Sequence, residues 1–557
     1  MKNIKLKKPT QNLLLIFIFY LFISVAMYLF YRRDFVWFGD DIYYQFQRIM
    51  GLSANFDQGL LASNISPANF GKIGYGTNIF YPWLTLIPFR LVFQFTGDWI
   101  SAYYKGLAFY FLVSLLISHY SMKKFSGSTK MAVIFTLIYN FSTYRLIEMF
   151  TRAALAEYLA TIFLPLCFLG FYELFFGDGE WKDLAMGLSL IILTHVLSVM
   201  MCLIVFVLVI LIFVKQIHFD KKHLVNFGKA VLSTVLATLV FTVPFISEEL
   251  FQKYGVPDRQ ILQGQSFTKL LLSSATNNVH RLVENNAYNI GLVLLLALIA
   301  GVWCYKEFSG KIKAIYWLFL VSLLVTTNLF PWHWLQNTPI EVIQFPYRFL
   351  MFTTLFGSVI ATVVLNKFLK QPWERHFVIL CSVVTIVTGG LWMVSIRLAL
   401  DSPSIPSPKL IITQKMINEN LIPDTYLTQY IPKKSLAKFD TVSQHQVFVN
   451  GEQSVQVPAV VGNGNDFYFE NVKKGSIIDL PYVRYKYTKA FVNGKSVPVW
   501  NSQRGSVELR VPENTKHLTI HLTYQNRKLF GLALIISIAT WIYLLVPIKV
   551  FSRKSIQ

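Results

Sequence analysis

The sequence is poor in charged residues, in cysteine and in the motifs of metal sites. Only 14% of the 557 residues are charged, whereas a soluble protein of this length carries about a quarter. The four cysteines lie in or beside apolar runs, and neither a CxxC pair nor a His/Cys cluster with zinc spacing occurs. These absences argue against a soluble protein and a zinc domain, and they leave the polar stretch after residue 400 without disulfides.

Acidic residues are also few, so that the formal net charge is +22. In a soluble protein this excess would suggest a nucleic-acid partner. In a chain that is 54% hydrophobic, membrane orientation and contact with anionic lipid headgroups explain it better. We therefore expect a lipid bilayer as the surroundings and no nucleic acid, and a basic outer surface could also attract polyanionic acceptors.

Twelve apolar runs predict membrane-spanning helices. They lie near residues 12–31, 100–121, 129–147, 154–176, 184–198, 199–214, 227–246, 289–305, 313–330, 347–366, 376–397 and 529–550. The first run follows Lys2, Lys5, Lys7 and Lys8 and lacks a small-x-small cleavage site, so we interpret it as an uncleaved helix. The pair at 184–214 has no polar loop between its halves and could instead be one long tilted helix.

The distribution of lysine and arginine predicts the topology. With the N-terminus in the cytoplasm, twelve crossings place every basic connecting segment in the cytoplasm, as the positive-inside rule expects. Both termini are then cytoplasmic, and residues 32–99 and 398–528 are among the outer segments. Within the first of these, residues 80–95 are apolar but interrupted by Pro82 and Pro88, which indicates a re-entrant or interfacial element.

The outer segment 398–528 differs in character from the rest of the chain and predicts a β-rich domain. It begins with a linker-like Ser/Pro run at 402–408. Val-Asn-Gly at 449–451 and at 492–494 favour type I′ hairpins, because Asn and Gly tolerate positive φ. We expect a small β-sandwich. The predicted organisation is therefore a transmembrane domain at 1–397, the β-rich domain at 398–528, and a last helix with a short basic tail at 529–557.

Two adjacent carboxylates, Asp40 and Asp41, follow the first predicted helix among Trp and Tyr residues. A carboxylate near low-dielectric surroundings can act as a general base or bind a metal. Gly39-Asp40-Asp41 could equally cap a short interfacial helix that begins at Ile42. The residues alone leave both interpretations open.

A charged segment occupies the predicted outer turn between the third and fourth helices. Arg145, Glu148, Arg152 and Glu157 could form local ion pairs that finish the helix ends. A charged residue at this depth in the membrane usually serves a function, however. The planar guanidinium group of arginine can donate two parallel hydrogen bonds to a phosphate. We favour a functional role here.

Three further positions are ambiguous when each is taken alone. His195 lies in or at the end of an apolar run, where a histidine either satisfies its own hydrogen bonds or serves a function. Tyr347 and Arg348 open the tenth helix, where such residues are ordinary interface anchors. Glu248 and Glu249 are expected to be a solvated helix end.

The charged and polar candidates converge on one predicted face. Polar residues present for unrelated structural reasons would be distributed over both faces of the membrane. The convergence of the candidates on one face therefore indicates an active site. The residues are Asp40, Asp41, Arg145, Arg152, Glu157, His195 and Arg348.

The order of these motifs resembles the GT-C superfamily of membrane glycosyltransferases, which use lipid-linked sugars. More narrowly, it is similar to the bacterial YfhO-like proteins and to a group labelled "6-pyruvoyl-tetrahydropterin synthase-related". The resemblance rests on Phe-Gly-Asp-Asp at 38–41, Arg-Ala-Ala-Leu-Ala-Glu-Tyr at 152–158 with Leu-Pro-Leu after it, Leu-Thr-His-Val-Leu-Ser at 193–198 and Gln-Phe-Pro-Tyr-Arg-Phe at 344–349. It implies a GT-C-like polytopic helical fold, with about 12 transmembrane helices and an extracytoplasmic β-sandwich before the last one.

The resemblance also implies a reaction: hexosyl transfer from a polyprenyl-phosphate carrier to a cell-envelope glycopolymer such as teichoic acid. Displacement at the anomeric carbon would pass through a transition state resembling an oxocarbenium ion. Asp40 or Asp41 would then accept the hydroxyl proton. The residues left to bind substrate are Arg145, Arg152, Glu157, His195, Tyr347 and Arg348. No cofactor is certain, although Asp41, Glu157 and His195 are plausible ligands for a divalent metal.

Two rival functions remain open from the sequence. A transporter or flippase for a lipid-linked envelope precursor would also have many helices and intramembrane charge, but it favours repeated halves and a polar path to the inner face. We find no convincing internal repeat in the sequence. The third possibility is a non-catalytic scaffold whose β-domain binds cell-wall polymer.

Overall fold

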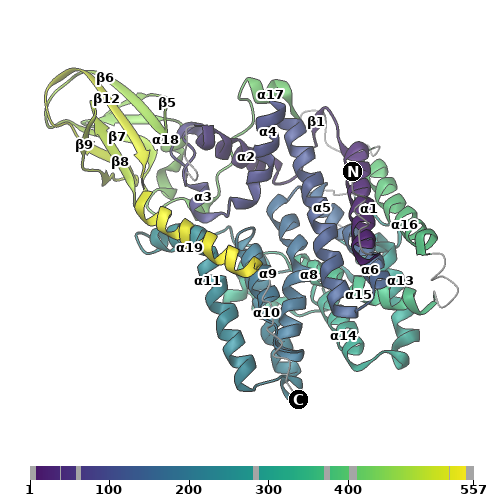
Figure 1. Ribbon diagram of the computed structural model, residues 1–557. Helices are drawn as coiled ribbons and strands as arrows, with labels where there is room; N and C mark the ends of the chain where they lie inside the picture. The colour runs from purple at the N-terminus through teal and green to yellow at the C-terminus, as the bar shows by residue number, and fades with distance from the viewer. Residues whose placement is uncertain are drawn as a thin grey trace, which may run out of the picture.

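The structure of the protein is a computed structural model that describes residues 8–37, 39–57, 64–279, 288–368, 377–400, 411–525 and 527–546. A bundle of helices forms most of the molecule, and a β-domain lies at one end of it (Figure 1). The linker-like run at 402–408 and the residues Lys2, Lys5 and Lys7 lie outside the described residues.

Seven of the described helices are long and apolar enough to cross a membrane, which makes the chain a multi-pass membrane protein. They are α1 (Lys8–Tyr31), α5 (Trp99–Ser126), α8 (Leu155–Phe176), α11 (Lys221–Glu249), α15 (Leu350–Phe368), α16 (Phe377–Leu400) and α19 (Arg527–Leu545). The other five predicted spans are shorter: α6 (Thr129–Asn140), α9 (Lys182–Ile192), α10 (Val196–Ile212), α13 (Gly291–Cys304) and α14 (Gly310–Val325). The predicted number of twelve spans is not confirmed, because even the 17 residues of α10 rise only about 26 Å, against a hydrocarbon core of about 30 Å.

The apolar stretch 184–214 forms two helices and not one. The Phe213 ring, after the end of α10, lies 6.5 Å from that of Phe176 at the end of α8. Nearby, the His218 amide donates to the Phe175 carbonyl at 3.0 Å. Because α9 also begins shortly after the end of α8, α9 and α10 form a hairpin that reverses at residues 193–195. His195 lies at the tip of this hairpin.

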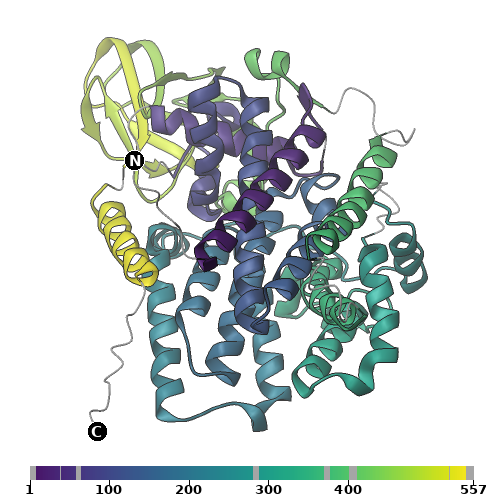
Figure 2. The same cartoon turned by 45° about the vertical axis from the view of Figure 1, so that its right-hand side comes forward.

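Basic connecting segments meet at the end of the bundle away from the β-domain. Lys124 forms an ion pair with Asp183 at 2.7 Å, which joins the end of α5 to the start of α9. Lys222, at the start of α11, donates to the Asp178 carbonyl at 2.6 Å. The β-domain lies toward the opposite end (Figure 2). This arrangement agrees with the predicted grouping of basic loops, and the side of the membrane that each end faces stays a prediction.

Short helices form a layer between the bundle and the β-domain. They are α2 (Ile42–Asp57), α3 (Thr77–Phe80), the 3₁₀ turn η2 (Leu84–Leu86) and α4 (Ile87–Thr96). Pro82 lies between α3 and η2, and Pro88 occupies the first turn of α4, where a proline lacks no helical hydrogen bond. The prolines therefore divide residues 80–95 into short pieces.

Two five-stranded antiparallel sheets make up the β-domain, in the orders β10-β11-β7-β3-β4 and β5-β6-β12-β8-β9. The strands are β3 (Gln446–Val449), β4 (Glu452–Val455), β5 (Ala459–Val461), β6 (Gly464–Val472), β7 (Ile477–Val483), β8 (Thr488–Val492), β9 (Lys495–Val497), β10 (Trp500–Asn501), β11 (Ser506–Arg510) and β12 (Thr515–Tyr524). Val447 and Leu509 of one sheet share a buried core with Phe467 and Ile520 of the other, so the domain is a β-sandwich.

Both predicted Asn-Gly turns are present. Asn450-Gly451 connects β3 to β4, and Asn493-Gly494 connects β8 to β9. All four residues have positive φ, as a type I′ turn requires. A separate small strand pair, β1 (Phe35–Val36) with β2 (Ile412–Thr413), ties the segment after α1 to the start of the polar C-terminal region.

Glu248, at the end of α11, is buried, and the expectation of a solvated helix end was wrong for this residue. Its carboxylate accepts hydrogen bonds from the hydroxyls of Tyr254 and Tyr524, each at 2.9 Å, and from the Lys486 amide at 3.0 Å. Tyr524 and Lys486 belong to the β-domain. The sequence pattern could not reveal this contact because the domain that covers Glu248 lies more than 200 residues further along the chain.

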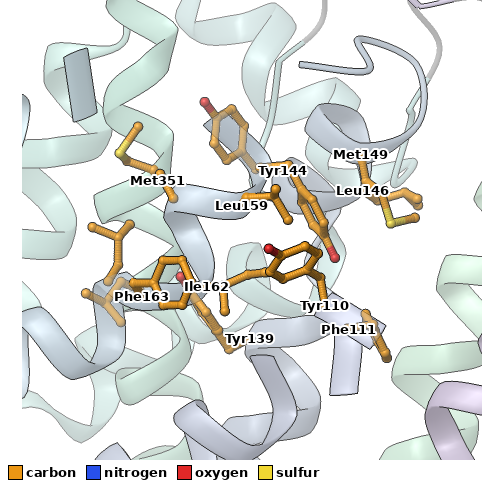
Figure 3. Packing of buried hydrophobic residues seen from close by; sticks show 14 of the residues in the cluster. Tyr110, Phe111, Tyr139, Tyr144, Leu146, Met149, Leu159, Ile162, Phe163 and Met351 are labelled. Atoms are coloured by element: carbon orange, nitrogen blue, oxygen red, sulfur yellow. The ribbon is translucent and has the colours of Figure 1, made fainter. Parts of the chain in front are cut away.

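Aromatic residues fill much of the core of the bundle. Figure 3 shows Tyr110 and Phe111 of α5 beside Tyr139 of α6 and Phe163 of α8. The hydroxyl of Tyr139 donates to the Thr161 carbonyl at 2.5 Å, and that of Tyr110 donates to the Thr85 carbonyl at 2.7 Å. This core holds α8 in place beneath the site described below.

Candidate active site

A cavity of about 750 Å³ lies where the helix bundle meets the loops that lead to the β-domain. Its wall includes seven of the eight residues that the sequence suggested: Asp40, Asp41, Arg152, Glu157, His195, Tyr347 and Arg348. They come from four separate segments of the chain, at 40–41, 152–157, 195 and 347–348. The fold therefore brings them together, and their chemical roles stay predictions.

Arg152 is the centre of a buried ion network. It lies between α7 (Thr143–Met149) and α8, and its Nη1 donates to Glu148 Oε2 and to Glu157 Oε2, both at 2.6 Å. Tyr144 donates to the other oxygen of Glu157, Oε1, at 3.2 Å. All four side chains are buried away from water. The charges are therefore stabilised by pairing with one another and not by hydration.

Arg348 joins this network from a distant part of the chain. It lies in the 3₁₀ turn η7 (Pro346–Phe349), and its Nε donates to Glu157 Oε2 at 3.2 Å. Its Nη1 donates to the Ile343 carbonyl and to Gln344 Oε1. Gln344 has φ +61°, a strained value for a residue other than glycine. The ring of Tyr347 lies 5.3 Å from the Arg152 guanidinium.

Asp41 stands directly before the first residue of α2, as the capping interpretation predicts. Its carbonyl accepts from the Gln45 amide at 2.9 Å. The side chain is half-buried in the cavity wall, and this burial raises the pKa of Asp41, although the charges of Arg152 and Arg348 oppose the rise. Asp40 is exposed at the same wall. Asp41 can therefore both precede the first turn of α2 and take part in a reaction in the cavity.

Gly39 allows the segment before α2 to approach the turn that carries Arg152. The Asp41 amide lies 3.4 Å from the Arg152 carbonyl oxygen, and Ala153 has φ +51°. A Cβ atom on residue 39 would overlap the side chain of Ala153 and lie 2.8 Å from the Arg152 carbonyl oxygen. A glycine is therefore needed here to hold Asp41 beside the arginine.

We expect Gly39→Ala to destabilise the protein by about 1–3 kcal/mol, the cost of overpacking a well-packed contact. Gly228→Ala is the matched control, because a Cβ atom at residue 228 in α11 meets nothing within 4 Å. The thermal unfolding midpoint in detergent should fall for Gly39→Ala and stay level or rise for Gly228→Ala. Equal midpoints would mean that the 39–41 segment is not held against the Arg152 turn.

His195 enters the cavity wall from the tip of the α9–α10 hairpin. Its Nδ1 is 2.8 Å from Ser198 Oγ, and its ring lies 6.1 Å from that of Tyr81. Because the contact to Ser198 uses Nδ1, a ligand in the cavity would meet the imidazole through Nε2.

Arg145 is the predicted residue that does not line the cavity. It is buried among neutral partners: it donates to Thr161 Oγ1, Asn140 Oδ1 and Ser114 Oγ at 2.7–3.0 Å, and its guanidinium lies over the rings of Tyr139 and Tyr158. The chain turns after α7 ends at Met149, which separates Arg145 from Arg152. Substrate contact by Arg145 therefore has no geometric support here.

Sequence reasoning missed a second part of the wall. It comprises Glu249, Gly255, Pro257, Asp258, Gln260, Val342, Gln344, Phe345 and residues 425–430. These lie in loops or at helix ends, where no periodic pattern points to a cavity. Two signals were available: Gln344 and Phe345 belong to the motif at 344–349, and the polar segment 425–430 contains tyrosines.

No group of three His, Cys, Asp or Glu side chains is arranged to hold a metal ion within the described ranges. The trio considered from the sequence, Asp41, Glu157 and His195, lines the same cavity without forming such a group.

An apolar groove of about 310 Å³ runs along α10 beside the cavity. It is lined by Met200, Leu203, Ile204, Val207 and Leu208, and Met200 also lines the cavity. The side chains of Leu203, Val207 and Leu208 are about half exposed. Because Met200 lines both, the apolar groove and the polar cavity lie next to each other.

Comparison with known proteins gives distant likenesses. No family model matches the chain. A protein of Lactococcus lactis subsp. cremoris (strain MG1363), named only as uncharacterized, is 22% identical over 334 residues, which are 57% of this chain and 54% of that protein. The chain therefore spans about half the length of the curated relative that it matches.

Two solved structures resemble this one. The arabinofuranosyltransferase AftD from Mycobacteria aligns with a TM-score of 0.42 and 12% identity, over 70% of this chain and 27% of AftD. ArnT from Cupriavidus metallidurans, bound to undecaprenyl phosphate, aligns with a TM-score of 0.39 and 12% identity, over 70% of this chain and 66% of ArnT. Both TM-scores lie below 0.5, so neither likeness by itself establishes what this chain does.

Proposed function

We propose that the chain is a membrane glycosyltransferase that moves a sugar from a polyprenyl-phosphate carrier to an acceptor hydroxyl on the outer face of the membrane. The observation that carries the proposal is a polar cavity, lined by carboxylates and arginines, that shares Met200 with an apolar groove on α10. A lipid-linked sugar needs both: a polar site for its sugar phosphate and an apolar path for its chain. The resemblance to YfhO-like proteins suggests the finer form, hexosyl transfer to a cell-envelope glycopolymer such as teichoic acid.

The leaving phosphate would contact the two buried arginines. The ion pairs of Arg152 use Nη1, and the contacts described for Arg348 use Nε and Nη1. The Nη2 group of each arginine can then donate a charge-assisted hydrogen bond to a phosphate oxygen. Glu157 holds both guanidiniums in place, and His195 and Tyr347 line the same part of the wall.

Asp41 is the better placed of the two aspartates to act as the general base. It would take the proton of the acceptor hydroxyl while that oxygen bonds to the anomeric carbon. The bond from this carbon to the phosphate oxygen breaks at the same time, and polyprenyl phosphate leaves with the bonding electrons. Asp41 is half-buried next to the arginines, whereas Asp40 is exposed to solvent, so Asp40 would be a poorer base.

The test is turnover by the purified full-length chain in lipid nanodiscs. Polyprenyl-phosphate hexoses and envelope glycopolymers are supplied, and both released polyprenyl phosphate and glycosylated acceptor are measured. We expect both products in equal amounts. Movement of an intact lipid-linked precursor across the bilayer without bond cleavage would instead indicate a transporter, and polymer binding without turnover would indicate a scaffold.

The raised pKa of Asp41 predicts a particular pH dependence. A general base works only when deprotonated, so kcat/KM should rise with pH through the pKa of Asp41. Because burial raises this pKa above the ordinary 3.8, the acid limb should lie at higher pH than a solvated aspartate would give. A pH–rate profile of wild type and Asp40→Asn should show the same limb. A limb at the ordinary aspartate pKa would contradict the assignment.

A further inference from the structure

The wall of the cavity has two parts with different chemistry. The helix half, composed of Asp41, Arg152, Glu157, His195, Tyr347 and Arg348, surrounds the buried ion network. The loop half is composed of Glu249, Asp258, Gln260, Gln344, Phe345 and residues 425–430. Most of the loop half comes from the end of α11 and the segment after it, at 249–260, and from residues 425–430, which follow β2.

The loop half carries only negative charge. Both arginines of the wall lie in the helix half, where Glu148 and Glu157 compensate their charges. In the loop half, Glu249 and Asp258 are the charged side chains among the described residues, and both are exposed. The cavity lining in the loop half therefore presents carboxylates and no cation, although the net charge of the chain is +22; Arg259, next to Asp258 in the chain, is exposed but does not line the cavity. A phosphate-bearing ligand would meet like charge there, which weakens binding.

The other side chains of the loop half suit a hydroxyl-rich ligand. Gln260, Gln344 and Gln429 offer amides that can both donate and accept hydrogen bonds. Phe345, Tyr426 and Tyr430 offer flat apolar faces, two of them with a hydroxyl at the edge. Carboxylates, amides and aromatic faces together can match the hydroxyls and the C–H faces of a sugar ring.

The β-domain holds part of this surface in a fixed position. The hydroxyl of Tyr485, after β7, donates to the Tyr430 carbonyl at 2.8 Å and accepts from the Gly76 amide at 3.0 Å. The ring of Tyr430 stacks on that of Phe80 at 5.4 Å. The end of the 425–430 segment is therefore held in place by packing against the sandwich, which favours binding because less of the surface must be ordered by a ligand.

We infer that the loop half is the acceptor subsite and that it takes an uncharged, hydroxyl-rich glycan end in preference to a phosphate-bearing chain. This inference rests on the proposed function, because it names the acceptor class of the same cavity. It changes the finer form of that proposal: the group that enters the cavity is a neutral sugar and not the polyanionic backbone of a teichoic acid.

The test compares two soluble acceptors of similar length, a neutral hexose oligomer and a glycerol-phosphate oligomer, with the full-length protein in nanodiscs. At low salt, kcat/KM should be at least roughly tenfold higher for the neutral acceptor. The double variant Glu249→Gln with Asp258→Asn should narrow this ratio severalfold, mainly by lowering KM for the phosphate-bearing acceptor. Added salt should narrow the ratio for wild type, because it screens exposed charge.

Glu452→Gln, which removes an exposed carboxylate from β4, is the matched control and should leave the ratio unchanged. Equal use of both acceptors by wild type would overturn the inference, as would a double variant with the wild-type ratio. Absence of polyprenyl phosphate release with every acceptor would overturn the proposed function and the inference with it. Release with the opposite acceptor preference would overturn the inference alone.

Discussion

Asp41→Asn should lower the rate of sugar transfer by roughly 10²–10⁴-fold, the usual contribution of a general base. Asp40→Asn should lower it by less than about tenfold, because Asp40 is exposed and a solvated carboxylate is a weaker base. The amide keeps the size of the carboxylate, so the Asp41 amide-to-Arg152 carbonyl contact and the start of α2 should survive. The pair of variants thus separates chemistry from helix capping at two adjacent positions.

The measurement is the initial rate of polyprenyl phosphate release at matched amounts of folded protein. Near-equal thermal unfolding midpoints for the two variants would confirm that the fold is intact. If Asp40→Asn had the larger effect, the base would be Asp40 and the site would open further toward solvent. If a protein with both substitutions, Asp40→Asn and Asp41→Asn, kept full activity, neither aspartate would take part in the reaction.

Residue patterns predicted the helices and hairpins because these depend on local sequence. Each of the twelve apolar runs forms a helix, and both Asn-Gly pairs form the expected turns, since hydrophobic periodicity and positive φ act over a few residues. Helix lengths were less well predicted. The run at 129–147 forms two helices, α6, which ends at Asn140, and α7. Hydropathy alone does not predict this break.

The candidate site was predictable to the extent that charge is costly in a membrane. Arg152 and Glu157 were suspected because charge at that depth usually serves a function, and Arg348 because the candidates converge on one predicted face; the structure pairs Glu157 with both arginines. The same reasoning could not separate Arg145, whose partners are neutral oxygens. Nor could it predict the burial of Glu248 or the place of residues 425–430 in the cavity wall, because their surroundings form only when distant segments meet in the folded chain.

Arg152→Met should destabilise the protein by about 3–5 kcal/mol, the cost of leaving buried carboxylates without their cation. Glu157 would still have Arg348 and Tyr144. Glu148 would have no charged partner among its described contacts. The double variant Arg152→Met with Glu148→Gln should therefore recover much of the lost stability, because a neutral amide is cheaper to bury than an unpaired charge. Thermal unfolding in detergent measures both effects.

Transfer activity should not recover together with stability. If Arg152 donates to the leaving phosphate, the double variant remains roughly 10²–10³-fold slower per folded molecule, the usual cost of losing one oxyanion donor. Arg145→Met is the matched control, because it removes an equally buried arginine that contacts neutral side chains outside the cavity. It should lose stability but keep its rate within a few-fold of wild type. Full activity in the Arg152→Met, Glu148→Gln protein would reduce Arg152 to a structural cation, and a slow Arg145→Met would return Arg145 to the site.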